Sequence, residues 1–441
     1  MRAFIASSIG VTCAAALVLP LAAPAGAAPD TPAHSAAMGG PAPAEASEPA
    51  PLSGSTQSLA LTSLPAASAR ATGQPIAVAA GQGLTERDVR AFSMVGVVWD
   101  DVSAELHGTA QVRTRATGTH RWSGWQDLET HNAEHSADPG TAERDSGAAR
   151  GSTAPLWVGD SDGVEVRVNP EAPDARGGSA PSVPLPGGLR LELVDPGKDP
   201  RQVPATGAAG ADRTAGITAL PALSRLATDA AAGYVPGAAP LIGPRPRIIT
   251  RQGWGADEKL RERAFTYTKS VKAAFIHHSA TGNNYACSQA PAVLRGIYRY
   301  HVRSSGWRDI GYNFAVDKCG NIYEGRAGGV TKAVMGAHTL GFNTNTMGIA
   351  VLGTFSDANP PAAAVNAVAK LTAWKLGLYG ANPKGRVTLV SGGSNKYKEG
   401  KKVELNVISG HRDGFATECP GARLYKKLGT ARTSSARLQG R

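Results

Sequence analysis

Two histidines and a cysteine give the sequence its clearest chemical signal. His411 and Cys419 lie in a loop-like, glycine-rich stretch, residues 410–421. His277 ends an apolar run at residues 273–276, far upstream. Imidazole nitrogen and thiolate sulfur are ligands that suit zinc. These residues therefore predict one zinc ion held by three side chains, with a fourth position open for water.

Such a site would suit hydrolysis. A catalytic zinc lowers the pKa of a bound water to about 7 and polarises the carbonyl group that is attacked. Amide hydrolysis also needs groups that stabilise the oxyanion and handle protons, and the hydroxyls of Tyr312 and Thr417 are candidates. The alternative is a closed structural zinc with a fourth protein ligand, for which His278 is the obvious candidate, and composition does not exclude it.

The elements that would position these residues alternate between strand and helix, which predicts an α/β domain over residues 246–430 with a central mixed sheet flanked by helices. His277 would end its first buried strand, and the loop carrying His411 would follow its last. Helical spacing predicts a helix at residues 290–301, and Pro360 opens another. Apolar runs predict strands at residues 271–277, 312–316, 322–324, 348–355 and 403–408.

Upstream, period-two alternation such as that of Val164, Val166 and Val168 predicts a small all-β, sandwich-like domain over residues 85–196. Ala/Pro/Gly/Ser-rich composition predicts disordered linkers around it. The predicted boundaries are a leader at 1–27, linkers at 28–84 and 197–245, and a basic tail at 431–441.

Two short motifs in the predicted β-domain match catalytic patterns. Residues 159–163 match a nucleophile elbow, but a strand follows instead of a helix, so we interpret them as a hairpin turn. The segment from His131 to His135 (His-Asn-Ala-Glu-His) matches an inverted zinc-peptidase pattern. It lacks an apolar helical face and runs on into Ser, Ala, Asp, Pro and Gly, so we interpret it as a solvated loop without a metal.

The first 27 residues resemble a secretory signal, with a basic start, an apolar core and a small-residue cleavage site. Cleavage would leave three cysteines. Export favours a disulfide, and the odd count leaves one thiol over, which a metal would explain. Pairing Cys287 with Cys319 would close a loop worth roughly 3–4 kcal/mol. Three unpaired thiols are the alternative.

The net charge of +11 predicts an anionic partner. Nucleic acid, acidic lipid and an anionic cell wall all match that sign. No segment after the leader is long and apolar enough to cross a bilayer. We therefore expect an exported monomer, secreted to the extracellular space or the cell wall.

The C-terminal domain resembles the peptidoglycan recognition proteins and the related phage-lysozyme-type zinc amidases. The resemblance covers roughly 180 residues and rests on ordered blocks whose spacing is specific to that family. The blocks lie at residues 251–256, 275–280, 306–314, 323–326, 336–343 and 410–421.

The resemblance implies an N-acetylmuramoyl-L-alanine amidase that binds the glycan and stem peptide of peptidoglycan, with no nucleic-acid partner. The alternative is a recognition protein that binds without cutting, which typically lacks the cysteine ligand. The residues after Arg326 match neither known form of the peptide-selecting motif, so the stem-peptide preference stays open. The implied roles are zinc ligation by His277, His411 and Cys419, catalysis by Tyr312 and Thr417, and substrate binding by His338 and Asn343.

Overall fold

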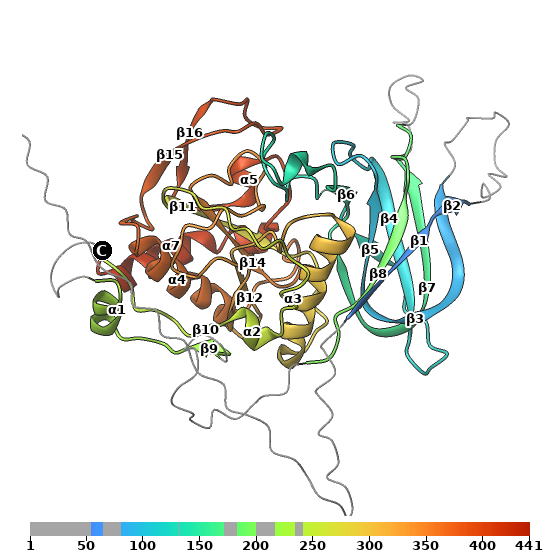
Figure 1. Ribbon diagram of the computed structural model, residues 1–441, viewed down its shortest axis with the longest axis horizontal. Helices are drawn as coiled ribbons and strands as arrows, with labels where there is room; N and C mark the ends of the chain where they lie inside the picture. Colours follow the sequence, from blue (N-terminus) through green and yellow to red (C-terminus); the bar gives the residue numbers. More distant parts are fainter. Residues whose placement is uncertain (1–53, 65–80, 131, 172–182, 200–216, 234–240) are drawn as a thin grey trace, which may run out of the picture. The chain divides into compact units, whose positions relative to one another are not determined.

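The computed structural model describes residues 54–64, 81–130, 132–171, 183–199, 217–233 and 241–441. The predicted leader lies outside these ranges. A β-sheet domain precedes an α/β domain, as the sequence predicts, and Figure 1 shows the two sheets. Residues from Ala50 to Arg441 belong to one compact unit. Within the described residues, no helix combines the length and the apolar character that a membrane span requires.

The N-terminal domain is an eight-stranded antiparallel sheet in the order β1-β8-β3-β7-β4-β5, with β2 and β6 also pairing with β3. Its long strand β3 pairs with β7 along most of its length and with β8 near its end. The inward side chains alternate along the strands, as in Val164, Val166 and Val168, and form an apolar core. The strands are β1 (Ser55–Ala60), β2 (Thr62–Ser63), β3 (Gln82–Trp99), β4 (Gly108–Ala116), β5 (Gln126–Leu128), β6 (Gly151–Ser152), β7 (Leu156–Pro170) and β8 (Arg190–Asp195).

The structure corrects two predictions in this domain. The linker predicted at 28–84 contains β1 and β2 and runs into β3. β1 is polar, and it is held by antiparallel pairing with the distant β8, a contact that local composition does not reveal. The hairpin predicted at 159–163 is also wrong, because β7 continues through it. Gly159 has a φ of +73°, and the pairing with β3 shifts register nearby, so this segment is an irregularity within a strand.

The C-terminal domain contains a seven-stranded sheet in the order β17-β11-β14-β12-β13-β10-β9. β17, β11, β14 and β12 are parallel, and β12 pairs antiparallel with β13. The sheet strands are β9 (Ala219–Leu220), β10 (Ile248–Ile249), β11 (Ala273–His278), β12 (Phe314–Val316), β13 (Ile322–Glu324), β14 (Thr346–Val351) and β17 (Ile408–Gly410), and β15 (Arg386–Val390) and β16 (Lys402–Asn406) form a separate hairpin.

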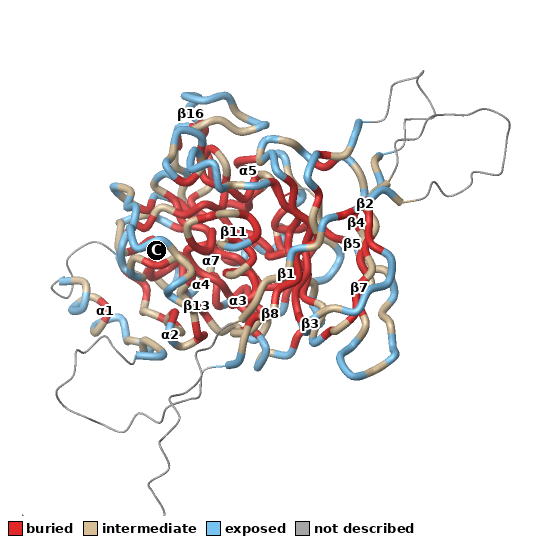
Figure 2. The backbone as a smooth tube through the Cα atoms, turned by 45° about the vertical axis from the view of Figure 1, so that its right-hand side comes forward, coloured by how far each residue is buried: buried red, intermediate tan, exposed pale blue. Residues whose placement is uncertain are grey.

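Helices cover both faces of this sheet. The alternating side chains of β14 divide between the faces: Ile349 packs with Leu371 of α4 in one core, and Ala350 belongs to the core that contains Ile297 of α3. In Figure 2, β11 runs through the buried interior, whereas β16 is more exposed. The helices are α1 (Arg225–Ala231), α2 (Arg251–Trp254), α3 (Ala290–Arg299), α4 (Ala362–Gly377), α5 (His411–Gly414), α6 (Ala422–Tyr425) and α7 (Leu428–Gln439), with one-turn helices at Arg144–Ser146 and Cys287–Gln289 and a π-turn at Tyr300–Ser304.

Three boundaries differ from the predictions. Residues 197–245 include β9 and α1, and Ile242 is buried in the main core, so this stretch is not a linker throughout. Residues 431–439 belong to α7, which packs on α4 through Ala431 and a hydrogen bond between Thr372 and Ser435. The strand predicted at 403–408 is divided between the hairpin strand β16 and the sheet strand β17. Only β17 leads into the loop that carries His411.

The two domains share an apolar core. Met94, Trp157 and Val194 of the β-domain belong to the same buried cluster as Leu294 and Ile297 of α3. Polar contacts lie beside it. The Tyr300 hydroxyl is 3.1 Å from the carbonyl oxygen of Thr153, and the Trp157 N–H donates to the Thr281 carbonyl at 3.1 Å. This interface fixes loops of the β-domain against the C-terminal domain.

Candidate metal centre

His277 and His411 come together because they follow paired positions on neighbouring parallel strands. Ile276 of β11 pairs with Gly410 of β17, and each histidine is the next residue along the chain. The carboxyl ends of parallel strands lie at the same edge of a sheet, where α/β proteins place their sites. Both histidines have no exposed surface. The sheet register therefore produces the first half of the centre.

Alternation along β11 separates His277 from its neighbour His278, because successive side chains of a strand point to opposite faces. His278 Nδ1 accepts a hydrogen bond from the backbone N–H of Phe355 at 3.3 Å, and Phe355 belongs to the main core. His278 was the obvious candidate for a fourth ligand in a closed site. The ring of His278 is therefore hydrogen-bonded to the Phe355 backbone and is not part of the metal cluster.

Cys419 completes the predicted trio. Its carbonyl accepts from the Arg412 N–H at 3.0 Å, and its own N–H donates to the Thr417 hydroxyl at 3.1 Å, which folds the loop back over α5. Its Sγ lies 3.7 Å from Nδ1 of His277. The side chain is buried, and it is the one free cysteine among the described residues. The three predicted ligands thus converge.

A fourth side chain enters the cluster from the β-domain. Nε2 of His135 lies 3.2 Å from Nδ1 of His411 and 3.5 Å from Sγ of Cys419. One ligand atom from each of the four side chains lies within 4.8 Å of the others. His135 ends the motif interpreted above as a solvated loop without a metal role. That interpretation is wrong, because Asn132, Glu134 and His135 are all buried.

The donor set fits zinc in both chemistry and spacing. Zinc–nitrogen bonds of about 2.05 Å and zinc–sulfur bonds of about 2.3 Å place the ligands of a tetrahedron about 3.3 Å (N to N) and about 3.6 Å (N to S) apart. Three of the six separations in the cluster, 3.2, 3.5 and 3.7 Å, are close to these values, and every pair of ligand atoms lies within 4.8 Å. Imidazole nitrogen and thiolate sulfur are both ligand types that zinc takes in proteins.

Burial controls the protonation of the cluster. It lowers the pKa of His277 and His411 well below the usual value, and the neighbouring histidines lower it further. It lowers the pKa of His135 to about 3. These imidazoles are therefore neutral at physiological pH, as metal ligation requires. Burial raises the pKa of the Cys419 thiol, so its thiolate needs a cation beside it.

The predicted catalytic hydroxyls lie beside the cluster. The Tyr312 ring precedes β12, with its centroid 5.4 Å from that of His277 and 6.0 Å from that of His135. Burial raises the pKa of its phenol, with smaller contributions from Cys419 and Glu134, so the phenol keeps its proton. Thr417 donates its hydroxyl proton to Oε1 of Glu134 at 2.6 Å. The Glu134 carboxylate of the β-domain is thus hydrogen-bonded to Thr417, one of the two predicted catalytic residues.

The predicted substrate-binding residues are completely buried. Asn343 Oδ1 accepts from the His338 N–H at 2.8 Å, and its Nδ2 donates to the Ser136 carbonyl at 2.9 Å and to Asp138 at 2.7 Å. His338 Nδ1 lies 3.0 Å from the Thr339 hydroxyl, which lies 3.5 Å from Nε2 of His277. Both residues border the centre, and the β-domain covers Asn343.

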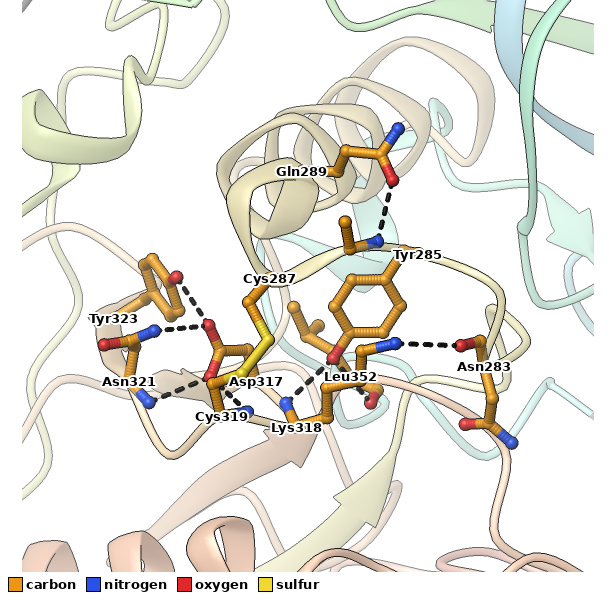
Figure 3. The surroundings of a disulfide bond; sticks show 11 residues. Asn283, Tyr285, Cys287, Gln289, Asp317, Lys318, Cys319, Asn321, Tyr323 and Leu352 are labelled. Atoms are coloured by element: carbon orange, nitrogen blue, oxygen red, sulfur yellow. Dashed lines mark hydrogen bonds between the residues drawn. A yellow bond between two sulfur atoms is a disulfide. The ribbon is translucent and has the colours of Figure 1, made fainter.

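The predicted disulfide joins Cys287 and Cys319, with Cα atoms 6.2 Å apart. Figure 3 shows it linking the turn before α3 to the turn between β12 and β13. The second turn is organised by Asp317, whose carboxylate accepts from the Cys319 N–H at 3.0 Å and from the Tyr323 hydroxyl at 2.9 Å. The bridge supports β12, the strand that follows Tyr312.

Residues 267–422 match the N-acetylmuramoyl-L-alanine amidase family model (Amidase_2), and residues 45–186 match the Rv3811 N-terminal galactose-binding domain-like family. Peptidoglycan-recognition protein SC2 of Drosophila melanogaster is 31% identical over 185 residues, which cover 42% of this chain and 85% of that protein. The human N-acetylmuramoyl-L-alanine amidase is 31% identical over 188 residues, 42% of this chain and 28% of the human protein.

Among solved structures, Drosophila PGRP-LB is 27% identical, covers 42% of this chain and 93% of its own, and has a TM-score of 0.33. The sequence matches define a peptidoglycan-recognition and amidase class of domain. This chain belongs to the peptidoglycan-recognition protein and N-acetylmuramoyl-L-alanine amidase family, and its function is peptidoglycan recognition or amide hydrolysis. The β-domain that contributes His135 lies outside the amidase match.

Proposed function

We propose that this protein is an exported, zinc-dependent N-acetylmuramoyl-L-alanine amidase. It hydrolyses the amide between the lactyl group of muramic acid and L-alanine of bacterial peptidoglycan. The observation that carries the proposal is the convergence of Cys419 with His277 and His411 beside the buried phenol of Tyr312. A protein that only recognises peptidoglycan has no need of a thiolate ligand or a phenol at this position.

Zinc bound there would polarise the scissile carbonyl and lower the pKa of the attacking water. The chain's own residues do the rest. The protonated Tyr312 phenol donates a hydrogen bond to the oxygen that becomes negative, and the Thr417 hydroxyl is placed for a second such contact once Glu134 has left it. Burial excludes bulk water, which strengthens both interactions. Water adds across the amide, leaving a lactyl carboxylate and a free L-alanine amine.

The partner and location follow from the same proposal. Peptidoglycan supplies both the glycan and the stem peptide, and the net charge of +11 favours binding to an anionic wall. The predicted leader supports export, and the disulfide between Cys287 and Cys319 suits an oxidising compartment. We place the mature protein in the extracellular space or the cell wall, acting as a monomer on peptidoglycan.

One observation favours a second candidate, a closed zinc site without catalysis. Structural zinc sites have four protein ligands, whereas catalytic sites keep one position for water. His135 supplies a fourth side chain here. The two candidates differ in whether removing that imidazole creates a working enzyme or merely a weaker metal site.

Mass spectrometry of the products from a defined disaccharide pentapeptide tests the proposal. The samples are the full-length chain, His135→Ala and the double variant His135→Ala/Cys419→Ala, each with and without a zinc chelator. We expect zinc-dependent release of the intact pentapeptide by His135→Ala and none by the double variant. Zinc-loaded, folded His135→Ala that releases no peptide would contradict amidase activity. A different released fragment would assign another bond.

A further inference from the structure

The metal centre is covered by one segment of the β-domain, residues 132–147, which connects β5 to β6. His135 reaches into the cluster from this segment, and its Nδ1 faces the Glu134 carboxylate at 4.0 Å. The segment therefore contributes a fourth donor to the cluster.

Two carboxylates of the same segment, those of Glu134 and Asp138, accept hydrogen bonds from polar groups around the centre. Glu134 accepts from the Thr417 hydroxyl, and its backbone carbonyl accepts from the Leu340 N–H at 2.9 Å. Asp138 accepts from the Asn343 side chain and from the Gly341 N–H, each at 2.7 Å. These contacts use groups that the family resemblance assigns to the reaction and to the substrate.

Further along the segment, Glu143 forms a paired salt bridge with Arg326, at 2.8 and 2.7 Å, and both side chains are buried. It also accepts from the Arg308 backbone N–H at 3.1 Å. Arg326 holds the pKa of Glu143 below its ordinary value, although burial acts in the opposite direction. Paired contacts of this kind fix orientation as well as adding energy.

The space left beside the centre is too small for a substrate. The pocket lined by His135, Tyr312, Thr417 and Cys419 leaves about 10 Å³ for a water-sized molecule. That is roughly the space of one water. A muramyl peptide cannot reach the metal ligands while the segment remains in place.

Release of the segment does not require the domains to separate. The main interface is an apolar core shared by β3, β7, β8 and α3, including Met94, Trp157 and Leu294. The segment, by contrast, is held by polar contacts and has exposed tips at Pro139–Gly140 and at residues 145–148. Local opening generally involves units with few apolar contacts and solvent-exposed backbone. The contacts of the segment are thus mainly polar, although residues 134–138 are buried, whereas the domains are joined by an apolar core.

We propose that His135 is the fourth zinc ligand and that residues 132–147 are an autoinhibitory segment, which must leave the metal centre before peptidoglycan can bind. The proposal rests on the amidase function for its consequence, but the ligand assignment stands independently of activity. Removing His135 frees a coordination position for water and substrate, which converts a closed site into an open one.

The ligand assignment is tested on the zinc-loaded, full-length chain by zinc K-edge X-ray absorption, which counts imidazole ligands by their multiple scattering. We expect three imidazoles and one sulfur in the wild type and two imidazoles and one sulfur in His135→Ala. The matched control is His120→Ala, which changes an exposed histidine of the same domain and should leave the count unchanged. Two imidazoles in the wild type would overturn the assignment.

The inhibitory role is tested by kcat/KM for the disaccharide pentapeptide. If the closed form exceeds about 90% of molecules, removing it raises the apparent activity at least tenfold. We expect that increase in His135→Ala and none in His120→Ala. A wild type as active as His135→Ala, with zinc bound in both, would overturn inhibition while leaving the amidase proposal intact. If the wild type shows three imidazoles but no variant hydrolyses the substrate, the amidase proposal and the inhibitory role are both contradicted. The assignment of His135 as a ligand would still hold.

Glu143→Gln provides a second variant that leaves every metal donor in place. It removes the charge that pairs with Arg326 and should loosen the segment without changing any of the four side chains of the metal cluster. We expect faster hydrolysis than the wild type, with an unchanged zinc content and three imidazoles in the resting state. Unchanged hydrolysis by both Glu143→Gln and a folded His135→Ala would contradict a segment that controls access.

Discussion

The metal centre is assembled from two regions that differ in how their residues are positioned. His277 and His411 follow paired strands of one sheet, and Cys419 is folded back by hydrogen bonds within its own loop. His135 comes from a connecting segment of another domain and depends on domain docking. The first region is held by one sheet and its own loop, whereas we propose that the second can be displaced. We infer that the C-terminal domain defines the reaction and that the β-domain segment defines when it occurs.

The largest effect should come from the rigid region. Cys419→Ala in the His135→Ala background removes the thiolate and leaves two imidazoles, so we expect hydrolysis to fall below detection and zinc to be lost on dialysis. Zinc analysis and product mass spectrometry measure the two outcomes. Retained hydrolysis with normal metal content would show that Cys419 is not a ligand. The C-terminal domain would then not define the reaction through this cluster.

Tyr312→Phe in the same background should reduce kcat by about 10²–10³-fold, the usual effect of losing one donor to an oxyanion. Zinc content should not change, because the histidine and cysteine side chains that would hold the ion in this background remain in place. Steady-state kinetics with parallel zinc analysis would show this. Loss of zinc in this variant would reassign Tyr312 from catalysis to support of the metal site.

Asp138→Ala tests whether the β-domain segment controls access to the metal centre. It removes two hydrogen bonds that hold the segment to Asn343 and Gly341. Hydrogen bonds to a charged group contribute about 1.5–3 kcal/mol each, enough to shift the opening equilibrium about tenfold or more. We expect kcat/KM to rise while His135 remains present. Hydrogen exchange of residues 132–147 should accelerate in parallel, and a rise in activity without faster exchange would point to another cause.

The smallest effect on activity should come from the disulfide. Cys287→Ser opens a loop whose closure contributes roughly 3–4 kcal/mol, so the melting temperature should fall by roughly 10 °C under oxidising conditions. Cys319→Ser is the matched control and should give the same shift. An unchanged melting temperature in both variants would mean that the bridge contributes little to the stability of the region around β12.

The difference between the two regions also explains what the sequence could predict. The ordered motifs and the apolar runs were sufficient for the α/β fold and for the convergence of His277, His411 and Cys419, and the cysteine count was sufficient for the pairing of Cys287 with Cys319. These features depend on local strands and on one sheet. Alternation along β11 was also available, and it could have excluded His278 from the cluster.

The fourth donor could not be predicted in the same way. His135 has no strand or helical periodicity around it, and it lies 142 residues before His277. Its burial arises from contacts between domains, such as those of Asp138 with Asn343. The available signal was compositional: two histidines and a glutamate lie within five residues, His131 to His135. Polar spacing alone does not distinguish a solvated loop from one buried against a partner.

The most direct test compares the wild type with His135→Ala in one assay, the rate of pentapeptide release from the defined disaccharide pentapeptide at equal zinc content. We expect at least a tenfold faster release by the variant, because a closed form that dominates the wild type is removed. Equal or slower release by a folded, zinc-loaded variant would contradict the claim that this is an amidase held closed by its own N-terminal domain.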